Sequence, residues 1–330
     1  MTAEKMKAIV ATGYGSPEVL QLQEVDRPQP KAKEVLVRVA TSAATTADTM
    51  MRTGKPYIAR LFVGLTKPKN AIPGTGFSGV VEQVGDKVSS FEVGDRVFGE
   101  TTFGFSANAE YLTISEEGVI LRMPENLDFS EAANFCDGHL TSFNFLSEIA
   151  NVKTGQKVLI NGASGALGTS AIQIAKHMGA HVTAVCSNRN AGLVKSLGAD
   201  EVIDYQQKDF TKSSEQYDYV YDTIGKSSFK RCKSILTENG TYLSPVLQFP
   251  LLLQMMITSV IGKKKAKFEA TGANKEEKLR YMLSEVLSIF RAGKLKTYID
   301  RQFPLEKLAE AHQYIDSGRK KGNVVIVTTK

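Results

Sequence analysis

The sequence predicts a two-domain protein of the α/β class, in which a β-rich region is followed by a doubly wound parallel sheet. Three observations predict this. The chain has 330 residues, more than a single hydrophobic core usually holds. Its first 120 residues contain short apolar runs separated by glycine and proline, and beyond Pro124 short apolar strands alternate with amphipathic helices. Apolar residues make up 42% of the chain and charged residues 23%, values typical of a globular protein.

The first region is expected to be a compact, twisted β domain with short turns. Apolar or alternating runs occur at residues 35–39, 80–84 and 96–98, as strands require. Glycines and prolines separate these runs, for example at Pro73 and Gly94, and such residues mark turns.

Beyond Pro124 the chain is expected to build βαβ units. Residues 131–149 have a helical pattern, and strands and helices then alternate at the spacing that a right-handed parallel sheet requires. The predicted strands are 157–160, 181–186, 202–203, 218–221 and 241–244, and the predicted helices between the first three are 167–178 and 191–197.

The C-terminal part is expected to contain helices over 275–292 and 305–317 and a last strand over 324–327. Before it, residues 246–262 form an apolar stretch that is followed by lysines at 263–265. Pro250 and two glutamines interrupt the stretch, which is too short for a membrane span. A buried or interface helix is therefore expected, with attachment to a membrane surface as the alternative.

A glycine-rich turn carries the first functional signal. Asn161–Gly168 reads Asn-Gly-Ala-Ser-Gly-Ala-Leu-Gly and lies between a predicted strand and a predicted helix. In that context Gly162 permits a tight turn, Gly165 lets a pyrophosphate approach the backbone, and Gly168 allows close packing of helix and sheet. The amide groups at the start of the helix then face the phosphates. A turn of this kind without a ligand is the alternative.

The end of the second strand indicates which dinucleotide is bound. A site that prefers NAD needs a carboxylate there for the ribose hydroxyls. Residues 186–190 read Cys-Ser-Asn-Arg-Asn and contain no acid. The Ser187 hydroxyl and the Arg189 guanidinium suit the extra phosphate of NADPH, although Arg189 could also be a solvated residue at a helix start. NADPH is the expected cofactor.

Composition argues for an ordinary intracellular enzyme. The formal net charge of +6 is mild, and we expect no nucleic-acid partner. Three scattered cysteines give no disulfide framework, and the N-terminus lacks an apolar leader, so a cytoplasmic location is expected.

Several motifs together resemble the zinc-independent quinone oxidoreductase branch of the medium-chain dehydrogenase/reductase superfamily. The resemblance covers nearly the whole chain. The motifs are Tyr14-Gly15-Ser16-Pro17-Glu18-Val19-Leu20, Pro73-Gly74 with Phe77–Val81, Val93–Gly99, the glycine loop, Ser196–Tyr205 and Gly322–Val325. The resemblance implies a GroES-like β domain, residues 1–124 plus 269–330, interrupted by a Rossmann NADP-binding domain, residues 125–268. It also implies a homodimer.

The resemblance further assigns binding roles. Thr141 is expected beside the nicotinamide, and Ser164, Gly165, Ala166 and Leu167 at the phosphates. Ser187, Arg189 and Tyr205 are expected around the 2′-phosphate ribose. The remaining positions, which are expected to line the adenosine and nicotinamide halves, are Thr223, Ile224, Gly225, Ser244, Pro245 and Val246.

The chain departs from its zinc-dependent relatives, which carry a cysteine near Ala44 and a Gly-His-Glu triplet where this chain has Gly74-Thr75-Gly76. Three cysteines and four scattered histidines cannot form a tetrahedral site at the usual spacings, so no metal is expected. Residues 45–48 read Thr-Thr-Ala-Asp where the branch often has an Asn-Pro-x-Asp pattern. Thr45 is the candidate hydrogen-bond partner of the acceptor oxygen, with capping of local backbone as the alternative.

Two more sets of polar residues are candidates for a functional role. His139 could act as an acid, although a plain helix-start residue fits it better. Asp48 and Arg52 are four residues apart and could pair on a helix surface.

The expected function is NADPH-dependent hydride transfer to a quinone or an α,β-unsaturated carbonyl, with no membrane contact. Two alternatives stay open: an NADPH-binding regulatory or RNA-binding protein without turnover, and a membrane-peripheral enone reductase that uses residues 246–262. For RNA binding, the basic run at 263–267 has only Phe268 as an aromatic neighbour.

Overall fold

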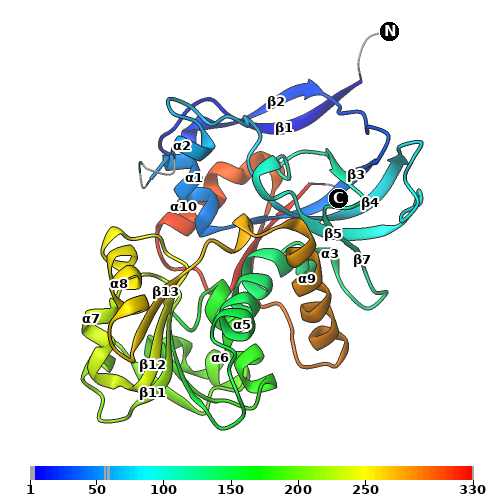
Figure 1. Ribbon diagram of the computed structural model, residues 1–330. Helices are drawn as coiled ribbons and strands as arrows, with labels where there is room; N and C mark the ends of the chain where they lie inside the picture. The colour runs from blue at the N-terminus through cyan, green and yellow to red at the C-terminus, as the bar shows by residue number, and fades with distance from the viewer. Residues whose placement is uncertain (1–3, 56, 58–59, 329–330) are drawn as a thin grey trace. The chain divides into compact units, whose positions relative to one another are not determined.

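The computed structural model of the chain describes residues 4–55, 57 and 60–328, without the side chain of Phe62. The described chain forms two compact units (Figure 1). Unit 1 comprises residues 1–137, 275–284 and 297–330, and unit 2 comprises residues 138–274 and 285–296.

Unit 2 is built on a six-stranded parallel sheet with the order β10-β9-β8-β11-β12-β13. The chain enters at β8, moves outward to β10, and then crosses to the other side of β8 with β11. This reversal between β8 and β11 is the switch point of a doubly wound sheet, the place where such folds bind ligands. The strands are β8 (Lys157–Asn161), β9 (His181–Cys186), β10 (Glu201–Asp204), β11 (Tyr217–Asp222), β12 (Leu236–Ser244) and β13 (Lys265–Phe268).

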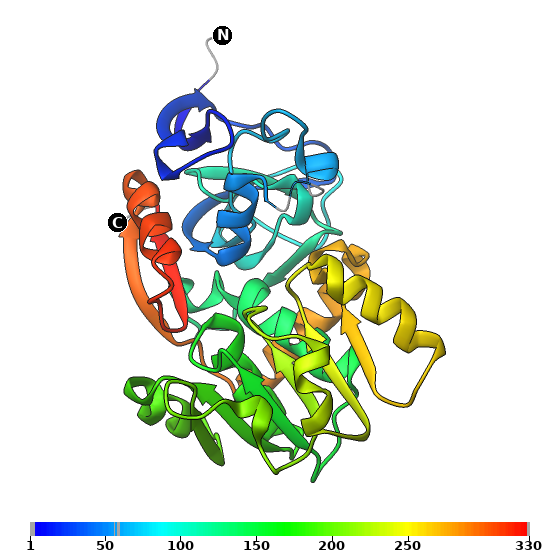
Figure 2. The same ribbon diagram turned by 90° about the vertical axis from the view of Figure 1, so that its left-hand side faces the viewer.

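Helices of unit 2 connect these strands (Figure 2). The first crossover, α5, ends where Gly179 adopts a left-handed φ of 80°, a conformation that favours glycine. The helical segments are α4 (Thr141–Phe143), the π-helical turn Asn144–Ile149, α5 (Ala166–His177), α6 (Ala191–Ser196), α7 (Phe229–Cys232) and α8 (Phe249–Val260), with short 3-10 turns at Asn188–Asn190, Phe210–Lys212, Lys233–Ile235 and Thr271–Ala273.

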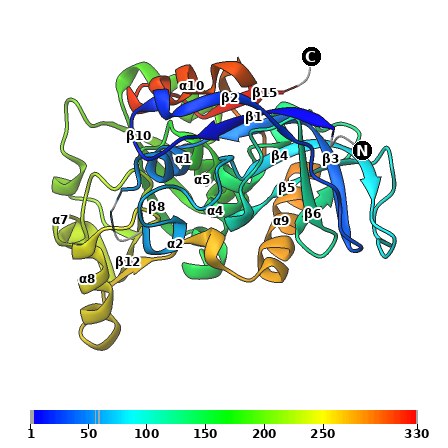
Figure 3. The same ribbon diagram turned by 90° about the horizontal axis from the view of Figure 1, so that it is seen from above.

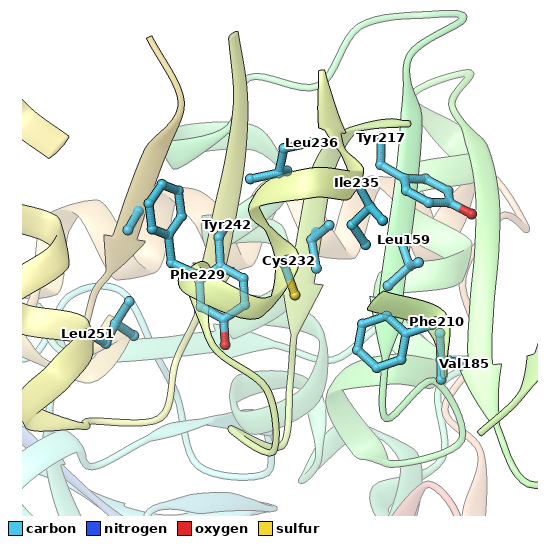
Figure 4. Packing of buried hydrophobic residues seen from close by; sticks show 12 residues of the cluster. Leu159, Val185, Phe210, Tyr217, Phe229, Cys232, Ile235, Leu236, Tyr242 and Leu251 are labelled. Carbon is cyan, nitrogen blue, oxygen red and sulfur yellow. The ribbon is translucent and has the colours of Figure 1, made fainter. Parts of the chain in front are cut away.

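One hydrophobic cluster joins the sheet of unit 2 to its helices (Figure 4). Leu159 and Tyr242 come from strands, while Phe229 and Leu251 come from α7 and α8. Tyr217, Tyr242, Leu159 and Leu251 are each at most 5% exposed. Burial of such large side chains is the main force that holds helices on a parallel sheet.

Unit 1 contains a hairpin and a seven-stranded sheet with the order β14-β15-β3-β4-β5-β7, in which β6 also pairs with β3. The hairpin strands β1 and β2 run side by side (Figure 3). The strands are β1 (Lys5–Ala11), β2 (Leu20–Asp26), β3 (Glu34–Ala44), β4 (Gly76–Val84), β5 (Arg96–Glu100), β6 (Tyr111–Ser115), β7 (Val119–Arg122), β14 (Ile299–Pro304) and β15 (Asn323–Val327).

Most helices of unit 1 are short. The longest, α9, is divided between the two units: its first part belongs to unit 1 and its last part to unit 2. The helices are α1 (Thr46–Thr53), α2 (Arg60–Val63), α3 (Phe129–Ala132), α9 (Glu276–Arg291) and α10 (Leu308–Asp316), with 3-10 turns at Pro17–Val19, Thr102–Gly104 and Leu305–Lys307 and a π-helical turn at Phe135–Leu140. Leu308, Ala311 and Ile315 of α10 are buried against β15 residues such as Val324.

The α/β class, the β-rich first region and the doubly wound sheet are confirmed. One expectation for the C-terminal part of unit 2 is wrong in part. The basic run at residues 263–267 leads into the edge strand β13. The apolar stretch contains α8, but most of its large side chains are exposed, for example Phe249 and Val260, so the helix is not buried within its unit. An interface helix or a membrane-surface helix stays a prediction. Among the described residues, no helix is long and apolar enough to cross a membrane.

Candidate cofactor site

The predicted cofactor positions of unit 2 converge on one edge of its sheet. Because all six strands are parallel, their carboxyl ends lie along the same edge. The glycine loop follows β8, Ser187 follows β9, Tyr205 follows β10, Thr223 follows β11 and Pro245 follows β12. The structure therefore brings these segments together, while their contacts with a cofactor stay predictions.

Each glycine of the loop has its own physical role. Gly162 has a φ of 80°, and a Cβ there would meet Thr223 Oγ1 at 2.6 Å. A Cβ on Gly168 would collide with the Gly162 carbonyl group, so only glycine lets α5 pack this closely. Gly165 differs, because a Cβ there would meet only Gly162 O at 3.5 Å. The space in front of Gly165 is open.

The start of α5 offers free donors at this open position. Gly165 is the N-cap residue, and no side chain caps the helix. The first amide groups of a helix have no intrahelical acceptor, and the helix dipole adds positive potential there. An anion such as a pyrophosphate satisfies both.

Residues that follow β9 and β10 form the second part of the candidate site. Ser187 is buried, whereas Arg189 is exposed on the 3-10 turn that follows. Asn190 is 6% exposed, and its Nδ2 donates to Ser164 Oγ at 2.9 Å. Its Oδ1 is buried without a hydrogen-bond partner. Tyr205 N donates to Cys186 O, which places Tyr205 beside the end of β9.

Asn190 is a candidate site residue that the sequence analysis missed. The motif around it drew attention to the hydroxyl and the guanidinium, and nothing in the residue order shows that Asn190 turns back to the glycine loop. An unsatisfied buried acceptor costs free energy. A ribose hydroxyl can supply the missing donor.

Thr141 lies at the start of α4, next to the glycine-loop helix. Its neighbour Ser142 donates from Oγ to Leu167 O at 2.9 Å, which ties α4 to the first turn of α5. Thr141 is half-buried. The structure thus places Thr141 near Leu167, as a shared binding region requires.

A buried network centred on Asp222 fixes the ends of three strands below the site. Asp222 is fully buried and accepts hydrogen bonds from Asn161 Nδ2 at 2.9 Å, Ser227 N at 2.7 Å and Tyr242 OH at 2.8 Å. Its backbone oxygen accepts from Ser244 Oγ at 2.8 Å. Burial and the adjacent Asp222 carboxylate raise the pKa of Tyr242, which therefore stays a donor. The sequence analysis missed this network.

The loop after β11 is held in place from two sides. Thr223 Oγ1 donates to Asn161 O at 2.8 Å, and Gln248 Nε2 donates to Gly225 O at 2.6 Å. Gly225 has a φ of 63°, which favours glycine. Ile224 between them is 44% exposed, so an apolar side chain faces the open edge. Taken with the uncapped α5 and the unpartnered Asn190 oxygen, these residues fit a dinucleotide.

Comparison with known proteins agrees with this geometry. The family model described as alcohol dehydrogenase GroES-like domain matches residues 31–125, and the one described as zinc-binding dehydrogenase matches residues 197–326. A chloroplastic quinone-oxidoreductase of Triphysaria versicolor is 32% identical over 99% of both chains. The chain belongs to the zinc-independent quinone oxidoreductase branch of the medium-chain dehydrogenase/reductase superfamily.

Further similarities lie within the same superfamily. A chloroplastic NADPH-dependent alkenal/one oxidoreductase of Arabidopsis thaliana is 28% identical over 98% of this chain and 80% of its own length. The structure of the quinone oxidoreductase from Coxiella burnetii superposes with a TM-score of 0.86 at 29% identity and covers 99% of this chain and 100% of the other.

As a member of this superfamily with a Rossmann-type sheet, the chain is an oxidoreductase that uses a nicotinamide cofactor. The GroES-like fold expected for the first region is confirmed as well. Within the described part of the chain, no group of three or more histidine, cysteine, aspartate or glutamate side chains is arranged to hold a metal ion. That the enzyme works without zinc stays a prediction.

Thr45, in unit 1, is occupied by a structural role. It is the N-cap of α1, where its Oγ1 accepts from Asp48 N at 3.0 Å and donates to Asp48 Oδ2 at 2.8 Å. Thr45 N donates to the same carboxylate at 2.8 Å, which completes a capping box. The residue is 4% exposed. These contacts support the capping alternative, and a role at the acceptor oxygen stays a prediction.

The other two polar candidates also have structural roles. Burial lowers the pKa of His139 to about 3, so the imidazole is neutral near pH 7 and a poor acid. Asp48 and Arg52 do not pair on a helix surface, because both are buried. Arg52 instead bonds Asp316 Oδ2 at 2.5 Å and Gly15 O at 2.6 Å, which links α1 to α10.

Three acids and a lysine interact within unit 1. Burial and the charge of Asp137 raise the pKa of Asp48 to about 6, and burial, Asp137 and Asp48 raise that of Glu100 to about 7. Burial also raises the pKa of Asp137 and lowers that of Lys320. These carboxyl groups therefore keep protons in the folded protein at a pH where the unfolded chain has released them.

This difference predicts a pH dependence of stability. Since the folded pKa values exceed the unfolded ones, the folded state binds more protons between about pH 4 and pH 7, and the free energy of unfolding falls as pH rises through that window. We expect urea denaturation to show a loss on the order of 2 kcal/mol from pH 5 to pH 8. Glu100→Gln should reduce this loss, whereas Glu24→Gln on exposed β2 should not. If the free energy of unfolding of Glu100→Gln depends on pH as that of wild type does, protonation of Glu100 does not contribute to the pH dependence of stability.

Proposed function

We propose that the chain is an NADPH-dependent reductase of quinones or α,β-unsaturated carbonyls, with residues 125–268 as the cofactor domain and residues 1–124 plus 269–330 as the substrate domain. The observation that carries the proposal is the open, uncapped start of α5 beside the acid-free end of β9. Relatives named for quinone and alkenal/one reduction support the class of acceptor. A homodimer and a cytoplasmic location stay predictions.

Different residues would bind different parts of the cofactor. The amide groups of Ala166 and Leu167 would bind the pyrophosphate, with Gly165 permitting its close approach and Ser164 held in place by Asn190. Arg189 and Ser187 would bind the 2′-phosphate, and Tyr205 would flank the adenosine ribose. Thr141 and residues 244–246 would orient the nicotinamide. When bound, NADPH supplies a hydride, and the protein contributes position and shielding from water.

A substrate panel tests this function. Purified protein should consume NADPH in the presence of phenanthrenequinone or a medium-chain alkenal, followed by the loss of nicotinamide absorbance. Omission of the acceptor is the control. If NADPH binds but no member of a quinone and enone panel is reduced, the proposal is wrong and a binding protein without turnover is the better description.

Cofactor choice is expected to depend on Arg189. Arg189→Ala removes a charge-assisted contact with the 2′-phosphate, so the KM for NADPH should rise about tenfold while that for NADH stays nearly constant. Arg291→Ala, an exposed arginine in α9, is the matched control and should change neither value. An equal loss with both cofactors would contradict a 2′-phosphate role.

A further inference from the structure

Two neighbouring segments of unit 1 expose large apolar side chains. Asn70 Nδ2 donates to Phe103 O at 2.8 Å, which joins the segment after α2 to the 3-10 turn that follows β5. Leu61 is 68%, Leu65 67% and Phe103 57% exposed. In the view of Figure 1, α2 lies at the outer edge of its unit. Large apolar side chains that gather on a surface indicate a contact with a partner.

The turn after α2 places two lysines beside these apolar side chains. Lys69 N donates to Val63 O at 2.7 Å, so the chain folds back onto α2. A Cβ on Gly64 would collide with Lys67 O, so Lys67 also lies against this turn. Both lysines are exposed, and they follow Leu65 by two and four residues. Exposed apolar and positively charged side chains therefore share one compact turn.

Another lysine and an arginine lie at the start of α2. Arg60 Nε donates to Gly54 O at 3.0 Å, which brings the exposed Lys55 next to the helix. The Arg60 guanidinium lies over the rings of Tyr14 and Tyr57, 4.4 and 4.8 Å from their centroids. Tyr57 is itself 66% exposed, so it adds an aromatic ring to the exposed apolar surface.

This surface, which we call the α2 patch, carries positive charge without acids. It consists of Lys55, Tyr57, Arg60, Leu61, Leu65, Lys67, Lys69 and Phe103. No aspartate or glutamate occurs between Asp48 and Glu82 or between Glu100 and Glu110. Among the described residues, none of the three lysines pairs with an acid. The described chain therefore does not neutralise these lysines.

We propose that the α2 patch docks the chain onto anionic lipid membranes. Protruding leucine and aromatic side chains insert into the interfacial region of a bilayer, while neighbouring lysines attract anionic headgroups. No spanning helix is needed for this. The inference goes beyond the proposed reductase activity and does not depend on it. It places the membrane contact in unit 1 rather than at residues 246–262.

Two other occupants fit the α2 patch less well. A pocket usually buries most of a bound small molecule, whereas Leu61, Leu65 and Phe103 are each more than half exposed. A symmetric contact with a second copy would bring the cations of both copies together, and like charges repel one another. An anionic bilayer meets neither objection.

Vesicle flotation tests the apolar part of the proposal. The wild-type chain should float with phosphatidylcholine vesicles that contain about a third phosphatidylglycerol, and should bind pure phosphatidylcholine far less. The variant Leu61→Ser/Leu65→Ser should lose binding at least about tenfold. Val93→Ser/Tyr281→Ser removes two exposed apolar residues elsewhere in unit 1 and should bind like wild type.

Charge reversal tests the cationic part. Lys67→Glu/Lys69→Glu should weaken binding to the anionic vesicles at least about tenfold, because each lysine near such a surface contributes about 1 kcal/mol. Lys275→Glu/Lys294→Glu changes the net charge equally at two exposed positions outside the patch and should weaken binding much less. Binding of the wild type should also fall as salt is added.

The outcomes that overturn the proposal are distinct. No flotation of the wild type with anionic vesicles would overturn it and leave an acidic protein as the candidate partner. Flotation of Leu61→Ser/Leu65→Ser equal to that of wild type would overturn it as well, provided circular dichroism shows both to be folded. Light scattering without lipid should give both the same molar mass. A lower mass for the variant would contradict the proposal, because a second copy would then cover the patch.

Discussion

Gly165→Asp should greatly weaken NADPH binding while leaving the protein as stable as wild type, or more stable. The space in front of Gly165 is open, and its φ of −82° suits any residue. Aspartate is a preferred N-cap, so the new carboxylate should accept hydrogen bonds from the first amide groups of α5 and stabilise the fold by about 1 kcal/mol. Those amide groups are the ones proposed to bind the pyrophosphate.

The same substitution places a negative charge against the phosphates. We expect the Kd for NADPH, measured by fluorescence titration, to rise at least about 100-fold, while the thermal midpoint is unchanged or higher. Gly165→Asn is the matched control, because it caps the helix without charge and should weaken binding less. A Kd like that of wild type in Gly165→Asp would mean that the pyrophosphate does not lie at this helix end.

Asp222→Ala should cause the largest loss of stability among the single substitutions considered in unit 2. Three buried donors, on Asn161, Ser227 and Tyr242, would lose their acceptor together. Unpaired buried donors cost about 1–3 kcal/mol each before the structure relaxes, so a net loss on the order of 3 kcal/mol is expected. Because these bonds fix the ends of β8, β11 and β12, NADPH affinity should fall too.

Thermal unfolding and cofactor titration of Asp222→Ala check this prediction. Asp218→Ala provides a matched control on the same strand. Asp218 accepts from Lys157 N at 2.8 Å and from Thr237 Oγ1 at 3.2 Å, and it is half-buried at the other end of β11. Its loss should cost about 1 kcal/mol and leave NADPH binding intact. Equal effects of the two substitutions would show that the Asp222 network has no special role.

Local patterns allowed much of the fold to be predicted. The strand β8, the glycine turn and α5 follow one another directly in the sequence. The conformation of the glycine loop could therefore be predicted from residues 157–177 alone. The expected preference for NADPH is also a local prediction, because residues 186–190 at the end of β9 contain no carboxylate. The motifs shared with the family then extended these local predictions to the whole chain.

Features that depend on distant segments could not be predicted in this way. Asn161, Asp222 and Tyr242 meet only because β8, β11 and β12 are neighbours in the sheet, and strand order is not visible in residue spacing. Asn190 likewise reaches Ser164 across 26 residues. The lysine-rich strand β13 was not predicted either, because lysine has a low strand propensity and the position of this segment at the edge of the sheet is not visible in its composition.

Thr45 shows a different limit. Its sequence position resembles a substrate-facing site, but Asp48 three residues later completes a capping box that occupies the hydroxyl. The pair satisfies the threonine–x–x–acid pattern of a helix start. Local capping chemistry thus explains this threonine without reference to a substrate.

Calorimetric titration of the folded wild-type chain with NADPH tests the central claim most directly. If the edge of the parallel sheet binds a dinucleotide at the start of α5, the titration gives a saturable heat with one site per chain and a weaker response to NADH. Absence of heat and of fluorescence change with both nucleotides, on protein shown to be folded, would contradict the cofactor site and with it the proposed reaction.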